Sequence, residues 1–402
     1  MTAFNNEGED IRGCYVSTGA RAKPGRTECG KLALSVSTGA RPRLLVALSL
    51  ALIPAFAVAA VVTKGYRAEQ RRLAAEWFER GSTALEGGQP DEAIEAFRTA
   101  LTFSRENRLF RLRLAQALAA DGRVAEARAY LLTLRDAQPG NGPVNLELAR
   151  LAARSGDAGE AHRYYHASIE GAWNDTAEAQ RRSIRLELAR FLVEHDITVQ
   201  AQSELIVLQG DLPPEPDLQK SVAALMLDAG LANRAMEIYQ QLLKSNPRDP
   251  AALAGAGLAA FETGSFIAAE SLLSKAAAAG ASGEELDAAL STTRLIGKLD
   301  PYQRRLPLRV RAARAVEALN IARARLERCG AARPDAQLGE PAGEIDGHLA
   351  ILVKPAARDL DAVDTAMDLV FRIEQITATL CGEPDGADRA LLLLARQRGG
   401  AI

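Results

Sequence analysis

The sequence has few of the residues on which most catalytic and cofactor sites depend. It contains 4 histidines and 4 cysteines among 402 residues, and no two cysteines form a C-x-x-C pair. It also has no G-x-S-x-G motif of the kind that carries a nucleophilic serine in hydrolases. We therefore predict a protein that is not an enzyme and that has no cofactor.

Strong net charge and abundant aromatic residues are missing as well. The 49 basic and 51 acidic residues leave a net charge of −2, and only 5% of the residues are aromatic. A nucleic-acid-binding protein needs a basic surface, and binding of single strands relies on aromatic side chains that stack on bases. The composition therefore predicts neither a nucleic-acid partner nor, given the lack of catalytic motifs, a small-molecule substrate.

Two short motifs suggest chemistry, and each lacks a required part. Residues 25–31 read GRTECGK and are close to a phosphate-binding loop, but Leu32 stands where Ser or Thr is needed. His162 and His166 are four residues apart, which places both on one face of a helix. No glutamate lies between them in the metalloprotease pattern, and the other two histidines are distant along the chain. We therefore predict no metal site.

The main feature of the sequence is an alanine that recurs at a nearly fixed interval. The intervals are 34, 34, 40, 34 and 34 residues, so one interval contains six extra residues. A period of this length indicates a stack of helical hairpins, each of which buries its apolar face against its neighbours. The recurring residues are Ala93, Ala127, Ala161, Ala201, Ala235 and Ala269.

Other residue types keep the same period. Five residues before each alanine stands a loop residue, which is glycine except at Asp196: Gly88, Gly122, Gly156, Gly230 and Gly264. Twelve residues before it stands a small residue: Gly81, Ala115, Ala149, Ala189, Ala223 and Gly257. Four residues after it stands a bulky one: Phe97, Leu131, Tyr165, Leu205, Tyr239 and Leu273. Glycine suits the end of a helix, small residues let two helices approach, and bulky residues fill the space toward the next hairpin.

This pattern resembles the tetratricopeptide repeat family. The first unit supplies Trp77, Gly81, Ala93, Phe97 and Ala100, and the second supplies Leu114, Ala115, Ala127, Leu131 and Pro139. The resemblance implies an all-α fold, a right-handed superhelical solenoid of helix hairpins with a helical C-terminal capping region. We expect six repeats in residues 74–283, at about 74–107, 108–141, 142–181, 182–215, 216–249 and 250–283.

The rest of the chain divides by composition. We expect a disordered tail in residues 1–43, a membrane anchor in 44–62, a linker in 63–73 and a helical capping region in 284–402, with a loop at Gly330–Gly347. Capping is the default role of the last region because a solenoid must cover its final apolar face. A separate partner-binding domain is the alternative.

The membrane anchor is predicted from Leu44–Val62, nineteen residues without charge. At about 1.5 Å per residue, this run is just long enough for a hydrocarbon core of ~30 Å. The small residues at Ala55–Ala57 leave a cleaved secretory signal open, but the run is long for one and 43 residues precede it. We predict a single-pass protein of a bacterial inner membrane with a periplasmic repeat domain.

Two cysteines in the C-terminal region bear on the compartment. Cys329 and Cys381 each end an expected helix, and each is followed by glycine. A disulfide between them would fit an oxidising compartment, and two buried free thiols are the alternative.

In tetratricopeptide proteins the first helix of each hairpin lines a concave groove, and the resemblance places five residues there. The ninth positions of that helix in the second to fourth repeats are Gln116, Arg150 and Arg190, with Arg154 and Lys220 at neighbouring positions. Arginine donates several hydrogen bonds in a fixed geometry, which suits the carboxylates of an extended peptide. A solvated polar face without a ligand is the alternative. We expect a scaffold that binds extended segments of other proteins, including envelope proteins. The alternative is an accessory subunit of an envelope polysaccharide or secretion enzyme system.

Overall fold

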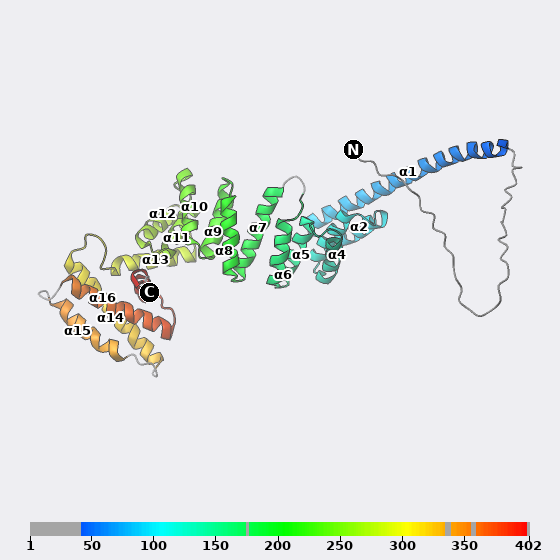
Figure 1. Ribbon diagram of the computed structural model, residues 1–402. Helices are drawn as coiled ribbons and strands as arrows, with labels where there is room; N and C mark the ends of the chain where they lie inside the picture. Colours follow the sequence, from blue (N-terminus) through cyan, green and yellow to red (C-terminus); the bar gives the residue numbers. More distant parts are fainter. Residues whose placement is uncertain (1–41, 174–176, 334–338, 355–358, 400–402) are drawn as a thin grey trace, which may run out of the picture. The chain divides into compact units, whose positions relative to one another are not determined.

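The computed structural model describes residues 42–173, 177–333, 339–354 and 359–399 (Figure 1). The chain divides into two compact units, residues 1–70 and 71–402. Within the described ranges the regular structure is helical throughout, apart from one isolated bridge between Asn141 and Ala172. The predicted tail, residues 1–43, lies almost wholly outside the described residues.

The first helix, α1, spans Pro42–Glu86 and contains the predicted membrane anchor. The side chains of residues 44–49 lie outside the described part. Lys64 and Arg67 follow Val62 in the same helix. Among the described residues no helix is both long and apolar enough to cross a membrane. This finding contradicts the prediction of a single-pass inner-membrane protein with a periplasmic repeat domain.

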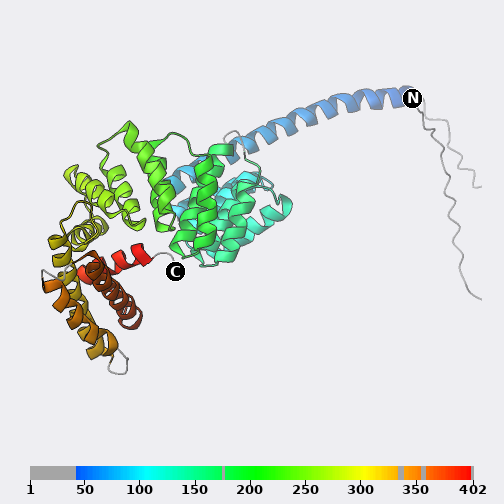
Figure 2. The ribbon, with the colours of Figure 1, turned by 60° about the vertical axis from the view of Figure 1, so that its left-hand side comes forward.

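The second unit begins with six helical hairpins, which follow one another along the chain (Figures 1 and 2). The last part of α1 packs on α2, and five further pairs follow, from α3 with α4 to α11 with α12. The bounds are α2 Pro90–Phe103, α3 Arg108–Ala120, α4 Val124–Ala137, α5 Gly142–Arg154, α6 Ala158–Ile169, α7 Ala177–Glu194, α8 Thr198–Gly210, α9 Pro216–Asp228, α10 Ala232–Ser245, α11 Pro250–Glu262 and α12 Phe266–Ala278. The predicted all-α solenoid of hairpins is confirmed.

The recurring residues have the environments that their types require. All six recurring alanines are fully buried, at 0% exposure. The five loop glycines have φ between 70° and 82°, in the left-handed region that other residues rarely adopt. Asp196, which replaces glycine in the fourth hairpin, has the same kind of backbone, with φ of 57°. Aspartate tolerates this conformation better than most residues, so the loop keeps its geometry.

The bulky residues pack in two ways. The ring of Phe97 lies against Gly81, and the side chain of Leu273 lies against Gly257, so both fill space within their own hairpin. Tyr239 instead lies against Gly255, in the next hairpin. The expectation that these residues reach the following hairpin therefore holds for Tyr239 but not for Phe97 or Leu273. In the latter two, the absence of a Cβ on the small residue leaves room for the bulky side chain.

We predict that Gly255→Ala destabilises the array. A Cβ at this position would lie 2.1 Å from Cζ of Tyr239, a buried ring that cannot move without displacing α10 from α11. Overpacking of this kind costs about 1–3 kcal/mol, more than the helix propensity gained from alanine. Denaturant unfolding measures the loss. Gly159→Ala is the matched control, because Gly159 is an exposed helical glycine with space around it, and this variant should keep or slightly increase the stability.

The six extra residues fall between the third and fourth hairpins, and Asn174–Thr176 lie outside the described residues. On the N-terminal side of this gap, hydrogen bonds hold the chain to its own hairpin. The N–H of Ala172 donates to the carbonyl of Gly140 at 2.8 Å, and the indole N–H of Trp173 donates to the carbonyl of Ser168 at 2.8 Å. Beyond the gap α7 packs on α6, so the stack continues across this junction.

Five helices follow the hairpins: α13 Glu284–Leu299, α14 Leu308–Ala332, α15 Gly339–Val353, α16 Leu360–Cys381 and α17 Gly386–Gly399. One hydrophobic core joins them to the last hairpin, since residues of α11 and α12 belong to the same buried cluster as residues of α14 and α16. The expected loop at Gly330–Gly347 is wrong in its second half, where α15 begins at Gly339. Ile345, Leu349 and Leu352 explain the helix, because they lie at helical spacing and pack against this core.

Candidate functional site

A groove of about 460 Å³ lies on the first helices of the second, third and fourth hairpins. Gln116 of α3, Arg150 and Arg154 of α5, and Arg190 of α7 all line it. The structure thus brings together four of the five residues that the repeat register places in the groove. Lys220 is not among them. It lies on α9 and pairs with Asp217 at 2.9 Å and Asp249 at 3.6 Å.

The side chain of Arg150 already forms hydrogen bonds with carboxylates of the same chain. Its Nε and one terminal nitrogen donate to the two carboxylate oxygens of Glu187, both at 2.8 Å. Its other terminal nitrogen donates to Glu147 at 3.1 Å, and Gln116 donates to the same Glu147 oxygen at 2.9 Å. The hydroxyl of Tyr165 donates to Glu187 at 2.9 Å. This network, which we call the groove network, joins α3, α5, α6 and α7.

The ionisation of the groove network follows from its contacts. Burial alone would raise the pKa of Glu187, but the hydrogen bonds and positive charge of Arg150 outweigh it, so this pKa lies below its ordinary value. The pKa of Tyr165 is raised by burial and by the negative charge of Glu187. Glu187 is therefore ionised and Tyr165 neutral at neutral pH, and the charge of Arg150 is balanced within the protein.

Arg154 and Arg190 remain as cations that can meet a ligand. Arg190 is exposed, and no side-chain hydrogen bond or ion pair is found for it among the described residues. Among the described residues the side chain of Arg154 makes one long hydrogen bond, 3.4 Å, to the carbonyl of Ala119. Both line the same groove as the aromatic ring of Phe191 and the carboxylate of Glu194.

The acidic half of the groove network is absent from the residues predicted from the sequence. Glu147 and Glu187 are 40 residues apart, which is one period plus the six-residue insertion, so they occupy equivalent positions in successive hairpins. This equivalence was the available signal that Arg150 has acidic neighbours on both sides.

A second polar cluster lies on the other helices of the hairpins. Nε2 of His166 is 3.2 Å from Nε2 of His162 and 3.2 Å from Oε1 of Glu204. His162 and His166 come from α6, and Glu204 comes from α8. These three ligand atoms all lie within 4.8 Å of one another. The spacing of the two histidines is visible in the sequence, but Glu204 is far from them along the chain and has no such signal.

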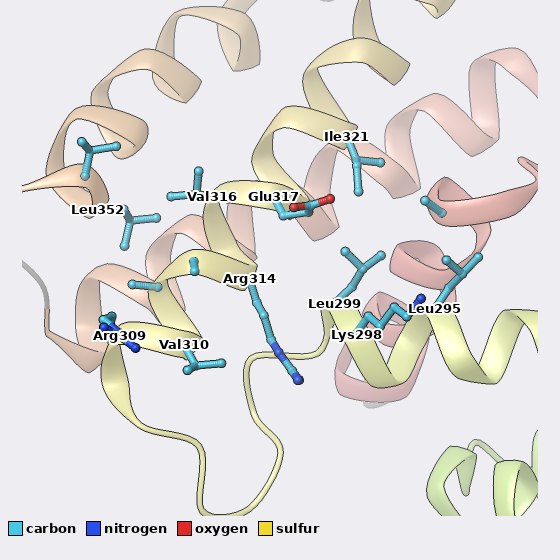
Figure 3. A pocket seen from close by; sticks show the side chains of 14 residues that line it. Leu295, Lys298, Leu299, Arg309, Val310, Arg314, Val316, Glu317, Ile321 and Leu352 are labelled. Carbon is cyan, nitrogen blue, oxygen red and sulfur yellow. The ribbon is translucent and has the colours of Figure 1, made fainter.

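The C-terminal helices contain a larger hollow, of about 870 Å³ (Figure 3). Its wall is mostly aliphatic, with Leu299 of α13, Val316 of α14 and Leu352 of α15, and Arg309 is a charged residue at its lining. Arg314, which also lines the hollow, donates to the carbonyl of Asp300 at 2.7 Å, so it holds the connection between α13 and α14. Nothing in the described residues indicates what this hollow would bind.

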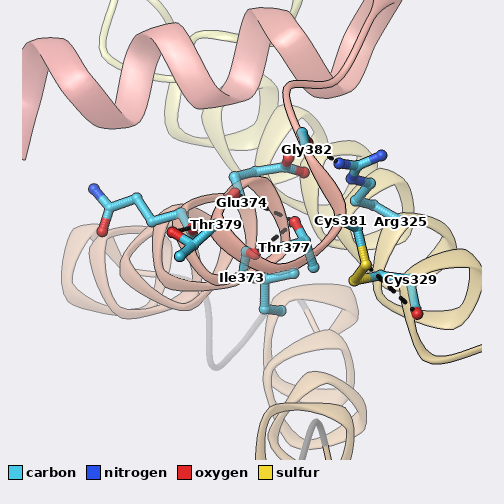
Figure 4. Close-up of a disulfide and its surroundings, with 9 residues drawn as sticks. Arg325, Cys329, Ile373, Glu374, Thr377, Thr379, Cys381 and Gly382 are labelled. Atoms are coloured by element: carbon cyan, nitrogen blue, oxygen red, sulfur yellow. Dashed lines mark hydrogen bonds between the residues drawn. A yellow bond between two sulfur atoms is a disulfide. The ribbon is translucent and has the colours of Figure 1, made fainter. Parts of the chain in front are cut away.

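A disulfide joins Cys329 of α14 to the last residue of α16, Cys381 (Figure 4). The S–S distance is 1.96 Å and the Cα atoms are 5.8 Å apart. Arg325 donates to the carbonyl of Gly382 at 2.7 Å and supports the same connection. The bond fixes two helices of the C-terminal region to each other.

The fold and the groove define a helical-hairpin repeat protein with a polar concave site. Two segments, residues 78–142 and 225–284, match the model of the tetratricopeptide repeat family. These two segments are therefore similar to tetratricopeptide repeats, as the sequence pattern indicated. No curated protein matches the chain.

Several solved structures are similar over much of the chain. A tetratricopeptide repeat protein from Parabacteroides merdae is 15% identical, with a TM-score of 0.39, over 70% of this chain and 100% of its own. PilW, a type IV pilus biogenesis factor, is 16% identical, with a TM-score of 0.40, over 54% of this chain and 98% of its own. YrrB, a repeat protein with an unusual peptide-binding site, is 14% identical, with a TM-score of 0.39, over 48% and 97%. At these values the similarities say nothing about what this chain binds.

Proposed function

We propose that this protein is a non-enzymatic scaffold that binds extended segments of other proteins in the groove of its repeats. The observation that carries the proposal is the exposed pair Arg154 and Arg190, on neighbouring hairpins and in one groove of about 460 Å³. An extended peptide can lie along such a groove and meet several first helices in turn. The ligand class is a segment with carboxylates, acidic or C-terminal.

The ion pairs within the groove determine which arginine is available to bind a peptide. Arg150 cannot turn to a peptide without leaving Glu187 half-buried and unpaired, which costs free energy. Among the described residues Arg190 has no hydrogen-bonded or ion-paired partner to give up, although its charge helps to lower the pKa of Glu187. The N–H donors of its guanidinium group are available to a peptide carboxylate. The proposal therefore assigns recognition to Arg190 and Arg154 and assigns Arg150 to the internal support of the groove.

We predict that Arg190→Ala weakens the binding of carboxylate-bearing peptides about tenfold, since hydrogen bonds to charged groups contribute roughly 1.5–3 kcal/mol and exposure reduces this value. The probe is a pooled library of synthetic decapeptides with free C-termini, followed by fluorescence polarisation of the members that bind. The same peptides with amidated C-termini separate recognition of the terminus from recognition of acidic side chains.

Arg248→Ala is the matched control. Arg248 is an exposed arginine of the same array, outside the groove, and its loss should leave peptide binding unchanged. Equal affinities of the wild type, Arg190→Ala and Arg154→Ala for every library member would disprove the proposed groove. So would the absence of any binding peptide.

A further inference from the structure

Three ligand-type atoms converge between the third and fourth hairpins, on the second helices and away from the groove network. They are Nε2 of His162, Nε2 of His166 and Oε1 of Glu204. The carboxylate of Glu204 is buried, with its side chain only 9% exposed, while the side chain of His166 is 36% exposed. The cluster therefore has a buried carboxylate on its inner side and is open to solvent beside His166.

Hydrogen bonds within this cluster cannot satisfy all of its polar atoms. Nε2 of His166 lies 3.2 Å from both an imidazole nitrogen and a carboxylate oxygen, but a ring nitrogen carries at most one proton and cannot give a full hydrogen bond to both. The second carboxylate oxygen of Glu204, Oε2, is buried, makes no hydrogen bond among the described residues and forms an ion pair of 3.6 Å with Arg185. Oε1 is therefore the carboxylate oxygen of Glu204 that faces the histidines and can meet a ligand beside them.

The spacing of the atoms fits a bound cation. Two ligands at about 2.0–2.1 Å from a tetrahedral metal ion lie about 3.3 Å apart. The two contacts of His166 already have this length, at 3.2 Å each. The third pair, between His162 and Glu204, is within 4.8 Å, so these two side chains would approach each other when an ion binds.

We propose that His162, His166 and Glu204 bind a divalent transition-metal ion, with solvent in the remaining position. Two imidazoles and one carboxylate are a ligand set that suits Zn²⁺ and its neighbours Co²⁺ and Ni²⁺, rather than Ca²⁺ or Mg²⁺, which prefer oxygen ligands. The ion links α6 of the third hairpin to α8 of the fourth. These hairpins flank the six-residue insertion, where the regular repeat is interrupted, so the metal stabilises the junction at its least regular point.

Arg185 of α7 is the charged neighbour that opposes the metal. One of its terminal nitrogens is 3.6 Å from Oε2 of Glu204, the oxygen that does not face the histidines. Its positive charge lowers the affinity of the site for a cation without blocking Oε1. The site should therefore bind its ion reversibly, and Arg185→Gln should bind it more tightly.

The experiment is isothermal titration of Zn²⁺ alone into the full chain stripped of metal with a chelator. A Cys14→Ser, Cys29→Ser background removes the thiols outside the described residues. We expect one ion per chain and a rise of about 5 °C in the melting temperature at saturation. His166→Gln should lose more than the 10–100-fold in affinity that changes around a metal site usually cost.

His195→Gln is the matched control, because His195 lies in the same array but outside the cluster and should keep wild-type binding. His162→Gln is the second test, and circular dichroism in chelator verifies that each variant is folded. Loss of binding in both cluster variants, with retention in His195→Gln, supports the site. Equal Zn²⁺ affinity of His166→Gln and the wild type, or no wild-type binding of Zn²⁺, Co²⁺ or Ni²⁺ tighter than about 10 µM, overturns it.

Discussion

Replacement of Cys329 and Cys381 by serine should destabilise the C-terminal helices by about 4 kcal/mol. The disulfide closes a loop of 52 residues, and a cross-link of this span removes about that much loop-closure entropy from the unfolded chain. The loop contains α15 and α16, so the effect should be largest in these helices and in α14. Because repeat proteins unfold in parts, hydrogen exchange resolved by segment is a better measurement than a single melting temperature.

The reduced wild type should behave like this double variant. Addition of reductant should increase exchange in α14 and α16 of the wild type and change nothing in the Cys329→Ser, Cys381→Ser protein. The Cys14→Ser, Cys29→Ser protein is the control, because it keeps the C-terminal pair and should respond to reductant as the wild type does. If wild-type exchange in these helices does not change on reduction, the bond does not support this region.

Much of the repeat geometry could be predicted from the sequence because each periodic position has one physical requirement. The recurring alanines are buried because two helices touch there, and the loop glycines follow from the left-handed backbone that ends each first helix. Asp196 replaces the recurring glycine in the sequence, but its backbone has the same left-handed conformation as the loop glycines. Here the tertiary context imposed the conformation, and the sequence alone could not show whether the loop would change.

The candidate site was harder to predict, because the repeat period shows which residues occupy equivalent positions but not which of them form ion pairs. The period placed Arg150 and Arg190 at equivalent positions of successive hairpins, and both line the groove. It did not show that Arg150 is held by Glu187 while Arg190 is not, since pairing depends on the distance between neighbouring helices. Glu204 has no sequence signal that links it to His162 and His166, because only the stacking of α8 on α6 and α7 brings them together.

The membrane prediction failed for a different reason. It rested on the hydropathy of Leu44–Val62 taken as one segment. In the structure this segment is part of a 45-residue helix that continues into charged residues, and no helix among the described residues is both long and apolar enough to cross a membrane. Similarly, α15 was missed because Gly and Pro near its start resembled a loop, although the buried residues that follow have helical spacing.

Beside the disulfide, a buried carboxyl group makes the C-terminal region sensitive to pH. Glu374 of α16 is 0% exposed, and neither of its carboxylate oxygens has a hydrogen-bond partner among the described residues (Figure 4). Burial, together with the negative charge of Asp388, raises its pKa from about 4.5 to about 8, although Arg325 and Arg328 oppose the shift. At neutral pH Glu374 is therefore protonated in the folded protein and ionised in the unfolded chain.

The sign of the pH dependence follows from this difference. Below pH 4.5 both states hold the proton, and the folded state has its full stability. Between about pH 4.5 and pH 8 only the folded state holds it, so stability falls as the pH rises, by about 1 kcal/mol per pH unit. Above pH 8 both states are ionised and this dependence ends. Asp388, whose pKa is also raised by burial, acts in the same direction.

We therefore expect Glu374→Gln to stabilise the C-terminal helices at pH 8 by a few kcal/mol and to have little effect near pH 4.5. Glutamine keeps the shape of the side chain but has no charge to bury. The measurement is denaturant unfolding of the wild type and the variant across this range, with hydrogen exchange to locate the change in α16. Glu383→Gln is the control, because Glu383 is exposed and pairs with Arg396, so its loss should leave the pH slope unchanged. Asp388 should leave a smaller slope in the variant. If Glu374→Gln has the same pH slope as the wild type, the carboxyl group of Glu374 is not the source of the dependence.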